Sequence, residues 1–402
     1  SIEAKQGYET YSRIQKMIPD MIKLLNGQNL TPEVVASLKP VTQEQAMAVA
    51  VLGQVSQDPS VKGKSPADVQ KFLESQMKEA LDYYTPQATQ QYNLDFDPRA
   101  SVVGDNYEDY TQKYYGNNHY EGPDAQHGTH VAGIIAGYPQ GTETQYGVGY
   151  KTAKIMTVRT VPNGDERDKD VANSIRYAVD NGAKILNMSF GKPVSPGKSA
   201  VWEAFKYAQD KGVLLVKAAG NENENIAENV YYPTNFKDVN DAKPFINNMI
   251  VVGASTNDNE FLRADFSNYN QKMVNVFAPG DKIYSTVPDG KYEYLQGTSM
   301  ASPVVAGAAS VLLAYMPNLK PEQIIESLVK TSNKSSVNAM INSNTNNRFD
   351  LISEAGGVID LSKAAEYAFT NFYKAGAPVT TAKPKAVKKM PKKTVKKTVK
   401  RK

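Results

Sequence analysis

The sequence contains no cysteine, which excludes disulfide bonds and thiolate metal sites. No apolar run approaches the roughly 18–20 residues that a helix needs to span a bilayer. Neither a methionine nor a signal-peptide pattern opens the chain at Ser1, so we expect a processed form or a fragment. The 402 residues are 41% hydrophobic and 22% charged, which is typical of a globular core domain with additions.

Basic charge is concentrated at the end of the chain. Residues 383–402 hold eleven Lys and Arg and no acid, so the net charge of +4 becomes about −7 without them. From about Gly376 the composition is rich in Ala, Pro, Thr, Val and Lys and lacks aromatic residues, and such a segment cannot bury enough apolar area to order itself. We therefore predict a basic disordered tail over residues 371–402. A solvated tail is favoured over contact with an anionic surface, and no nucleic-acid partner is expected.

Residues 1–99 have the pattern of a helical N-terminal region. Apolar residues recur at helical spacing between Ile14 and Leu25. Thr31 followed by Pro32 is typical of an N-cap with proline at the first helical position, and Ser65 precedes a predicted helix over Pro66–Tyr84. No catalytic motif occurs in this region.

Residues 100–370 alternate short apolar runs with helical patterns. Candidate strands are Ala100–Val103, Ile155–Val158, Lys184–Ser189, Val213–Ala218, Met249–Gly253 and Val274–Phe277. Candidate helices are Val171–Asn181, Ser199–Lys211, Ser299–Tyr315 and Ser362–Asn371. Near-continuous apolar strands separated by helices predict an α/β domain, with a mostly parallel sheet and helices on both of its faces.

A serine at the start of an apolar helix is the first candidate for chemistry. Ser299 lies in Gly-Thr-Ser-Met-Ala-Ser-Pro, where Gly297 permits a tight turn and Pro303 falls near the helix start. The free N–H groups of a helix N-terminus favour developing negative charge. A serine hydroxyl still needs a base, an orienting acid and donors for the oxyanion before it attacks a carbonyl. A simple helix-capping role is the alternative for the short motif alone.

Two further fragments can supply the base and a donor. His127 and His130 are two of only three histidines and lie in His-Gly-Thr-His, ahead of a small-residue helix. Their spacing could suit a metal, but no carboxylate or third histidine stands at a suitable local spacing. Asn221 follows the apolar strand that ends in Ala-Ala-Gly, where its amide can donate to an oxyanion. By itself it could equally be a turn residue. The third histidine, His119, lies in a polar loop and is expected to be exposed.

Together these three fragments resemble the subtilisin-like serine proteases, or subtilases. The resemblance covers about residues 100–330 and implies a serine endopeptidase with protein or peptide substrates. It implies Ser299 as nucleophile, His127 as base, Asn221 as oxyanion donor and a structural role for His130. The chemistry requires no cofactor, and the family's habit implies secretion or a cell-envelope location. A catalytically dead binding scaffold on the same fold is the alternative.

The resemblance also implies where a substrate binds. An extended peptide adds to a sheet edge at Ser189, Phe190 and Gly191. Ala218 and Gly220 form the wall of the pocket for the residue before the scissile bond, and small residues there imply a roomy, largely apolar pocket and broad specificity. The opposite edge falls near Pro162–Asp170, which is more charged than is usual in the family. Its acids leave structural Ca²⁺ binding as a possibility, with a solvated loop favoured.

The acid of the triad is not where the resemblance requires it. Subtilases have the order Asp, His, Ser, with Asp-Ser-Gly or Asp-Thr-Gly after a strand, and neither tripeptide occurs here. Asp105 is too close before His127 along the chain to belong to that strand, and Asp124 is closer still. Asp95 and Asp97 follow no apolar strand. We expect the acid-bearing strand to precede Ser1, with residues 1–99 as an insertion between the Asp and His motifs. A propeptide at residues 1–99, or loss of the acid, are the alternatives.

Overall fold

A computed structural model describes residues 2–91, 93, 95–122, 124–162, 164–341 and 347–373. They form two compact units, the first drawn from residues 1–120 and 159–174 and the second from residues 121–158 and 175–402. The predicted basic tail lies outside the described residues beyond Tyr373. Each unit is a separate body with its own core.

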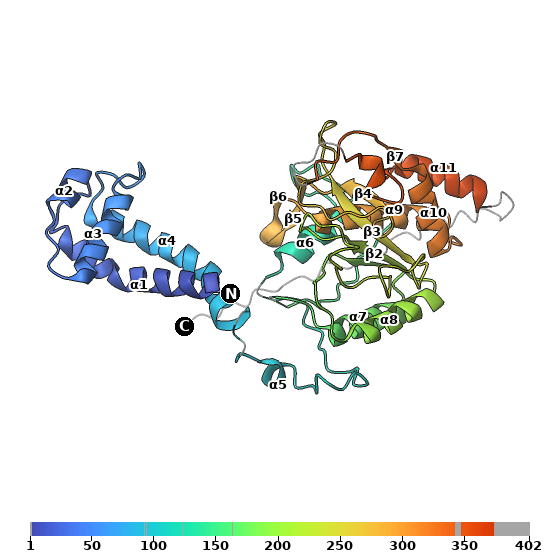
Figure 1. The fold of residues 1–402 in the computed structure, drawn as a ribbon, viewed down its shortest axis with the longest axis horizontal. Coiled ribbons are helices and arrows are strands. Elements are labelled where there is room, and N and C mark those ends of the chain that lie inside the picture. Colours follow the sequence, from blue (N-terminus) through green and yellow to red (C-terminus); the bar gives the residue numbers. More distant parts are fainter. Residues whose placement is uncertain are drawn as a thin grey trace, which may run out of the picture. The chain divides into compact units, whose positions relative to one another are not determined.

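The first unit is built around four helices with the predicted caps. They are α1 (Ile2–Leu24), α2 (Pro32–Ser37), α3 (Gln43–Val55) and α4 (Pro66–Pro86). The side chains of Thr31, Thr42 and Ser65 each accept a hydrogen bond from a backbone N–H in the first turn of α2, α3 and α4. Helix α1 packs along α3 and α4, and α1 and α4 lie side by side (Figure 1). Buried apolar side chains between these helices make an independent core.

Two predicted strands are wrong. Residues 100–102 lie instead in a short helix, α5 (Arg99–Val102), and Val103 is its C-cap; this helix follows a π-helical turn η1 (Gln87–Gln91) in the chain. The Val103 and Gly104 N–H groups both donate to Arg99 O, at 2.8 and 3.0 Å, and Gly104 ends the turn at a φ of +74°. Residues 155–158 belong to neither a helix nor a strand, and Ile155 is 44% exposed. Short apolar runs form strands only where a neighbouring strand pairs with them.

The second unit contains the predicted parallel sheet. Its strands follow the order β1-β2-β3-β4-β8-β7, and all neighbours are parallel except the β7–β8 pair. The strands are β1 (Ile185–Met188), β2 (Leu214–Ala218), β3 (Met249–Ser255), β4 (Val276–Pro279), β7 (Asn333–Lys334) and β8 (Gly357–Val358). A separate antiparallel hairpin pairs β5 (Ile283–Val287) with β6 (Lys291–Leu295).

Helices cover both faces of this sheet. All five residues of β2 are buried, and Leu214 and Val216 share a core with α9 (Thr298–Tyr315). The residues of β2 that alternate with Leu214 and Val216 point to the opposite face of the sheet. Helix α8 (Lys198–Asp210) contacts β2 on that face. The other helices are α6 (Gln126–Ala136), α7 (Asp168–Asp180), α10 (Pro321–Thr331) and α11 (Leu361–Asn371), with short 3₁₀ turns η2 (Pro288–Gly290) and η3 (Phe349–Leu351) (Figure 1). The α/β prediction is confirmed.

The central helix α9 carries the serine motif through the core. Among the described helices, only α9 is long and apolar enough to cross a membrane, and 67% of it is buried inside the protein. It packs against β1, β2, β3 and β4 and against α6. Burial of this kind accounts for its apolar composition, because a helix that is hydrophobic all round fits the middle of a core.

Candidate functional site

Ser299 is the second residue of α9 and is held there by contacts with the end of β1. Gly297 precedes the helix with a φ of +147°, a conformation that side chains other than glycine rarely adopt. The Ser299 Oγ hydroxyl donates to Ser189 O at 3.3 Å, and Ser189 Oγ donates in return to Ser299 O at 2.8 Å. Ser299 is half-buried, so its hydroxyl is positioned without being sealed from solvent.

Pro303 explains why the Ser299 carbonyl is available to accept the hydrogen bond from Ser189 Oγ. Proline has no N–H, so it cannot make the helical bond to the carbonyl four residues earlier, which is that of Ser299. Pro303 is the sixth residue of α9, deeper in the helix than the motif suggested. The Ser189 hydroxyl takes the place of the missing donor and ties the nucleophile candidate to β1.

A polar bridge that the sequence did not reveal supports the same contact. Asn187 Nδ2 donates to Ser189 Oγ at 2.9 Å, and Ser302 Oγ donates to Asn187 Oδ1 at 2.7 Å. The bridge joins the middle of β1 to the first turns of α9. A lone amide inside an apolar strand was the available signal, because a buried polar side chain requires a partner.

Asn221 is oriented by the residue next to Ser299. Its Oδ1 accepts from Thr298 N at 2.8 Å and from Thr298 Oγ1 at 3.0 Å. Thr298 Oγ1 also accepts from Gly220 N at 3.0 Å, so the β2 end and the α9 start are joined directly. With the amide oxygen held in this way, the exposed Nδ2 group is left to donate to a ligand. Thr298 was missed by sequence reasoning as an orienting residue.

The remaining predicted substrate residues lie after two neighbouring parallel strands. Met188 of β1 pairs with Lys217 of β2, so both strands end at the same edge of the sheet. Ser189, Phe190 and Gly191 follow β1, whereas Ala218 ends β2 and Gly220 follows it. The carboxyl edge of a parallel sheet is where ligands bind in α/β proteins.

His127 lies in the first turn of α6, which packs against α9. Its side chain is exposed, yet desolvation by the surrounding protein, followed by the charge of His130, lowers the pKa of His127, while Asp124 raises it. A lowered pKa keeps the imidazole neutral and able to accept a proton near pH 7. No carboxylate hydrogen-bonds to the His127 ring within the described residues.

His130 is wholly buried one turn further along α6. Its Nε2 lies 3.1 Å from Glu293 O of β6, and its Nδ1 has no hydrogen-bond partner among the described residues. Burial lowers the pKa of His130 against the opposing effect of nearby carbonyl groups. The imidazole is therefore neutral in the fold, and it joins α6 to the β5–β6 hairpin.

This burial makes stability dependent on pH. Below the ordinary histidine pKa of about 6.5 the unfolded chain takes up protons that the folded chain resists, so stability is complete above that pH and falls as the pH decreases. We expect the thermal midpoint to fall between about pH 6.5 and 5 and the slope to flatten in His130→Gln. Calorimetry across this range is the measurement. His119→Gln, at an exposed histidine, is the control and should keep the original slope; an unchanged slope in His130→Gln would contradict the assignment.

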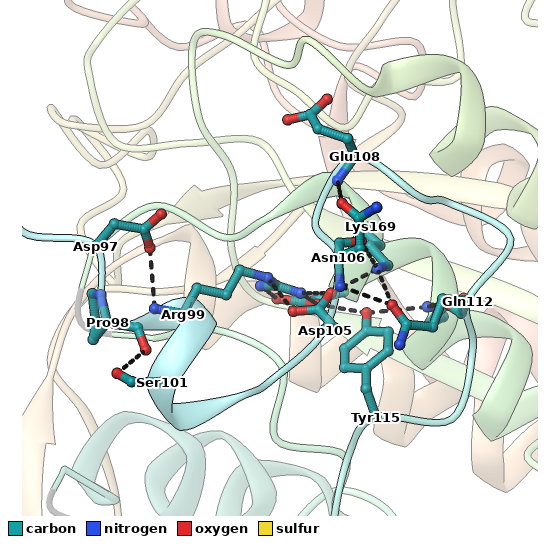
Figure 2. A network of polar contacts seen from close by, with 12 residues as sticks. Asp97, Pro98, Arg99, Ser101, Asp105, Asn106, Glu108, Gln112, Tyr115 and Lys169 are labelled. Atoms are coloured by element: carbon teal, nitrogen blue, oxygen red, sulfur yellow. Dashed lines mark hydrogen bonds and ion pairs between the residues drawn. The ribbon is translucent and has the colours of Figure 1, made fainter.

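Asp105, one of the aspartates considered for the triad, is held within the first unit by cations. Both carboxylate oxygens bind Arg99, at 2.7 and 2.8 Å, and one also accepts from Lys169 Nζ at 2.6 Å (Figure 2). Arg99 also binds both oxygens of Asp170 at 2.8 Å, and Tyr115 OH donates to Asp170 at 2.6 Å. The Asp105 side chain is 0% exposed, and Arg99 above all lowers the pKa of its carboxyl despite burial. The Asp105 carboxylate is therefore part of a structural ion-pair network.

The acids near residue 165 do not assemble a metal site in the described structure. No group of three or more His, Asp or Glu side chains that could hold a metal occurs in the described part of the chain. Asp170 is occupied by Arg99 and Tyr115. Structural Ca²⁺ binding therefore stays a prediction.

Comparisons with known proteins agree on one family. The family model described as "Subtilase family" matches residues 49–352. The chain is 36% identical over 225 residues to the cell wall-associated protease of Bacillus subtilis (strain 168), which covers 56% of this chain and 23% of that protein. It is 41% identical over 187 residues to thermitase of Thermoactinomyces vulgaris, covering 46% and 60% respectively. The chain thus spans less than two thirds of the length of these relatives.

A solved structure described as a cold adapted subtilisin-like serine proteinase is also similar. It is 31% identical in sequence, has a TM-score of 0.45, and covers 58% of this chain and 72% of that one.

Proposed function

Because this chain belongs to the subtilase family, we propose that it is a serine endopeptidase that hydrolyses peptide bonds through an acyl-enzyme. Ser299 attacks the carbonyl of the peptide, and His127 takes its proton and later returns it to the leaving amine. The backbone N–H of Ser299 and the Asn221 amide stabilise the oxyanion. Protein or peptide substrates bind along Ser189, Phe190 and Gly191. No triad acid is assigned within the described residues.

The observation that supports this proposal most directly is the orientation of Asn221. Thr298, the neighbour of Ser299, holds the Asn221 carbonyl through two hydrogen bonds of 2.8 and 3.0 Å. An asparagine that served only a turn would have no need of a partner at the start of α9. This orientation of the amide supports a role for the Asn221 donor in oxyanion stabilisation.

The breadth of specificity and the location are further proposals. Small residues at Ala218 and Gly220 favour acceptance of many side chains, so broad specificity stays a prediction. A relative named as cell wall-associated supports an extracellular or cell-envelope location. Fractionation of the source cells with an antibody to this chain tests the location.

A binding scaffold without catalysis is the second candidate. It is favoured by one specific observation, the occupation of Asp105 by Arg99 and Lys169. A chain with no acid behind His127 would retain the peptide-binding edge and turn over poorly.

Covalent labelling separates the two candidates. We expect a fluorophosphonate probe to modify the chain at Ser299, because its hydroxyl lies at a helix N-terminus and the pKa of the proposed base, His127, is lowered so that it can accept a proton near pH 7. Intact-mass spectrometry with peptide mapping locates the adduct. Ser299→Ala should abolish labelling, whereas Ser199→Ala, at an exposed serine of α8, should retain it. Absence of labelling in the folded wild-type chain would favour the binding scaffold.

A further inference from the structure

Tyr231 lies across the two glycines assigned to the substrate pocket. A Cβ atom added to Gly191 would lie 2.2 Å from Tyr231 Cε1, and one added to Gly220 would lie 3.0 Å from Tyr231 Cδ1. These two ring carbons are bonded neighbours, so one edge of the phenol ring lies between the walls that follow β1 and β2. At Gly191 the Tyr231 ring is the nearest group, whereas at Gly220 it shares the space with Asn268 Nδ2 and Glu222 Oε2, which would lie 2.3 and 2.6 Å from an added Cβ.

Contacts on both sides keep the ring in this place. The Lys217 ammonium of β2 lies 4.6 Å from the centre of the Tyr231 ring, which is within range of a cation–π interaction. Lys217 is 2% exposed and donates to Ala218 O at 2.5 Å, so the cation is itself anchored. The next residue, Tyr232, makes two backbone hydrogen bonds with Lys192, at 2.9 and 2.8 Å, just beyond Gly191. The backbone bonds of Tyr232 hold this segment in place, and rotation of the Tyr231 ring would break its contact with the Lys217 ammonium.

We infer that Tyr231 determines specificity by filling the base of the pocket for the residue before the scissile bond, so that this pocket accepts small side chains such as alanine and excludes large ones such as phenylalanine. This inference rests on the proposed function, since it takes the segments at Gly191 and Gly220 as the pocket walls. It replaces a roomy pocket with a shallow one.

The physical basis is the close packing of protein interiors. Non-bonded carbon atoms meet at about 3.5–4.0 Å, and a core has few voids larger than a water molecule. We expect a methyl group to be accommodated beside the edge of the Tyr231 ring. A benzyl group needs the volume that the ring already occupies, and it can enter only if the cation–π contact with Lys217 is broken.

Three variants distinguish an effect of the size of the Tyr231 ring from an effect of its hydroxyl group and from a general loss of folding. Tyr231→Gly removes the ring, and Tyr231→Phe retains its size. Tyr315→Gly alters a 73% exposed tyrosine at the last residue of α9 and serves as the matched control. Circular dichroism and thermal unfolding verify that each variant is folded before it is compared.

Reaction with Ser299 measures the preference directly. Peptidyl phosphonates that carry an alanine-like or a phenylalanine-like side chain form a bond between Ser299 Oγ and phosphorus, with loss of a phenol and transfer of the serine proton to it. We expect the alanine-type reagent to react at least about tenfold faster with the wild-type, Tyr231→Phe and Tyr315→Gly chains. In Tyr231→Gly the preference should vanish or reverse. Equal rates for the two reagents in the wild type, or an unchanged ratio in a folded Tyr231→Gly, would overturn the inference.

A second arm does not require catalysis. Acetylated tetra-alanine with a free carboxylate, and the same peptide with phenylalanine at its C-terminus, bind as products to Ser299→Ala, and titration calorimetry compares their affinities. The alanine peptide should bind more tightly with Tyr231 present, and the phenylalanine peptide should gain affinity in Ser299→Ala/Tyr231→Gly. If a fluorophosphonate fails to label Ser299, the proposed function fails, and the peptide affinities alone decide whether Tyr231 fills the pocket.

Discussion

Replacement of His127 by alanine is expected to slow hydrolysis of a peptide substrate about 70-fold in this chain. In subtilisin, loss of the serine or the histidine lowers turnover about 2 × 10⁶-fold and loss of the acid alone about 3 × 10⁴-fold, and the three act as one unit. A chain whose base has no acid behind it has already lost the second factor. Division of the first factor by the second gives about 70, which is the contribution that remains for His127.

The size of this effect therefore reports on the acid. Initial rates with an internally quenched peptide measure it, with His119→Ala as the control at an exposed histidine that should leave the rate unchanged. A fall near 10⁶-fold would mean that a carboxylate orients His127 in this chain and would contradict our assignment. Repetition in Asp105→Asn then tests Asp105, whose carboxylate is already bound by Arg99 and Lys169.

Replacement of Asp105 by asparagine is expected to destabilise the first unit by about 3–5 kcal/mol, because it leaves buried cations without their partner. Lys169 and Asp105 are 1% and 0% exposed, and their ion pair is 2.6 Å long. An asparagine keeps the shape and loses the charge. Hydrogen exchange of residues 99–115 measures the loss where it occurs, and thermal unfolding measures it globally.

The matched control is an aspartate in an exposed ion pair of the same unit. Asp82 pairs with Lys78 at 2.5 Å, and the two side chains are 65% and 75% exposed. Pairs of this kind contribute at most about 1 kcal/mol, so Asp82→Asn should change stability little. Equal effects of the two variants would show that the network around Asp105 is not energetically important.

The pH dependence of this network follows from the charge on Asp105. Arg99 lowers the pKa of the Asp105 carboxyl, so the stabilisation is complete above the ordinary aspartate pKa of about 3.9. It is lost as the pH falls through the lower value of the folded state. The stability of the first unit should therefore fall with decreasing pH more steeply in the wild type than in Asp105→Asn, so that the difference between the two shrinks in acid, because the variant has no proton to gain at this position.

Patterns within short stretches predicted much of the fold. The helices over α4, α7, α8, α9 and α11 and the strands β1, β2 and β3 fall where periodicity and capping residues place them. The strand expected at Ala100–Val103 failed because its four residues carried no information on a pairing partner. Helical bonds to Arg99 satisfy that segment locally instead.

The residues of the candidate site also divide into those that a local sequence pattern predicts and those that only the fold reveals. Ser299 and Asn221 were predicted from their motifs, because a serine at a helix start and an amide after a strand leave a local signature. Thr298 and Asn187, which orient them, have no such signature. Their partners lie 77 and 115 residues away in the sequence, so only the folded chain identifies them.

The sequence by itself determined the family, the parallel sheet and the residue types available for peptide hydrolysis, since these depend on motifs and on periodicity within single elements. The tertiary structure alone decided that Asp105 is bound by Arg99 and Lys169, and that Tyr231 lies over Gly191 and Gly220. Small residues at the two walls predicted an open pocket. Whether a pocket is open depends on which side chains pack against its walls. Here the side chain is that of Tyr231, which comes from another part of the chain.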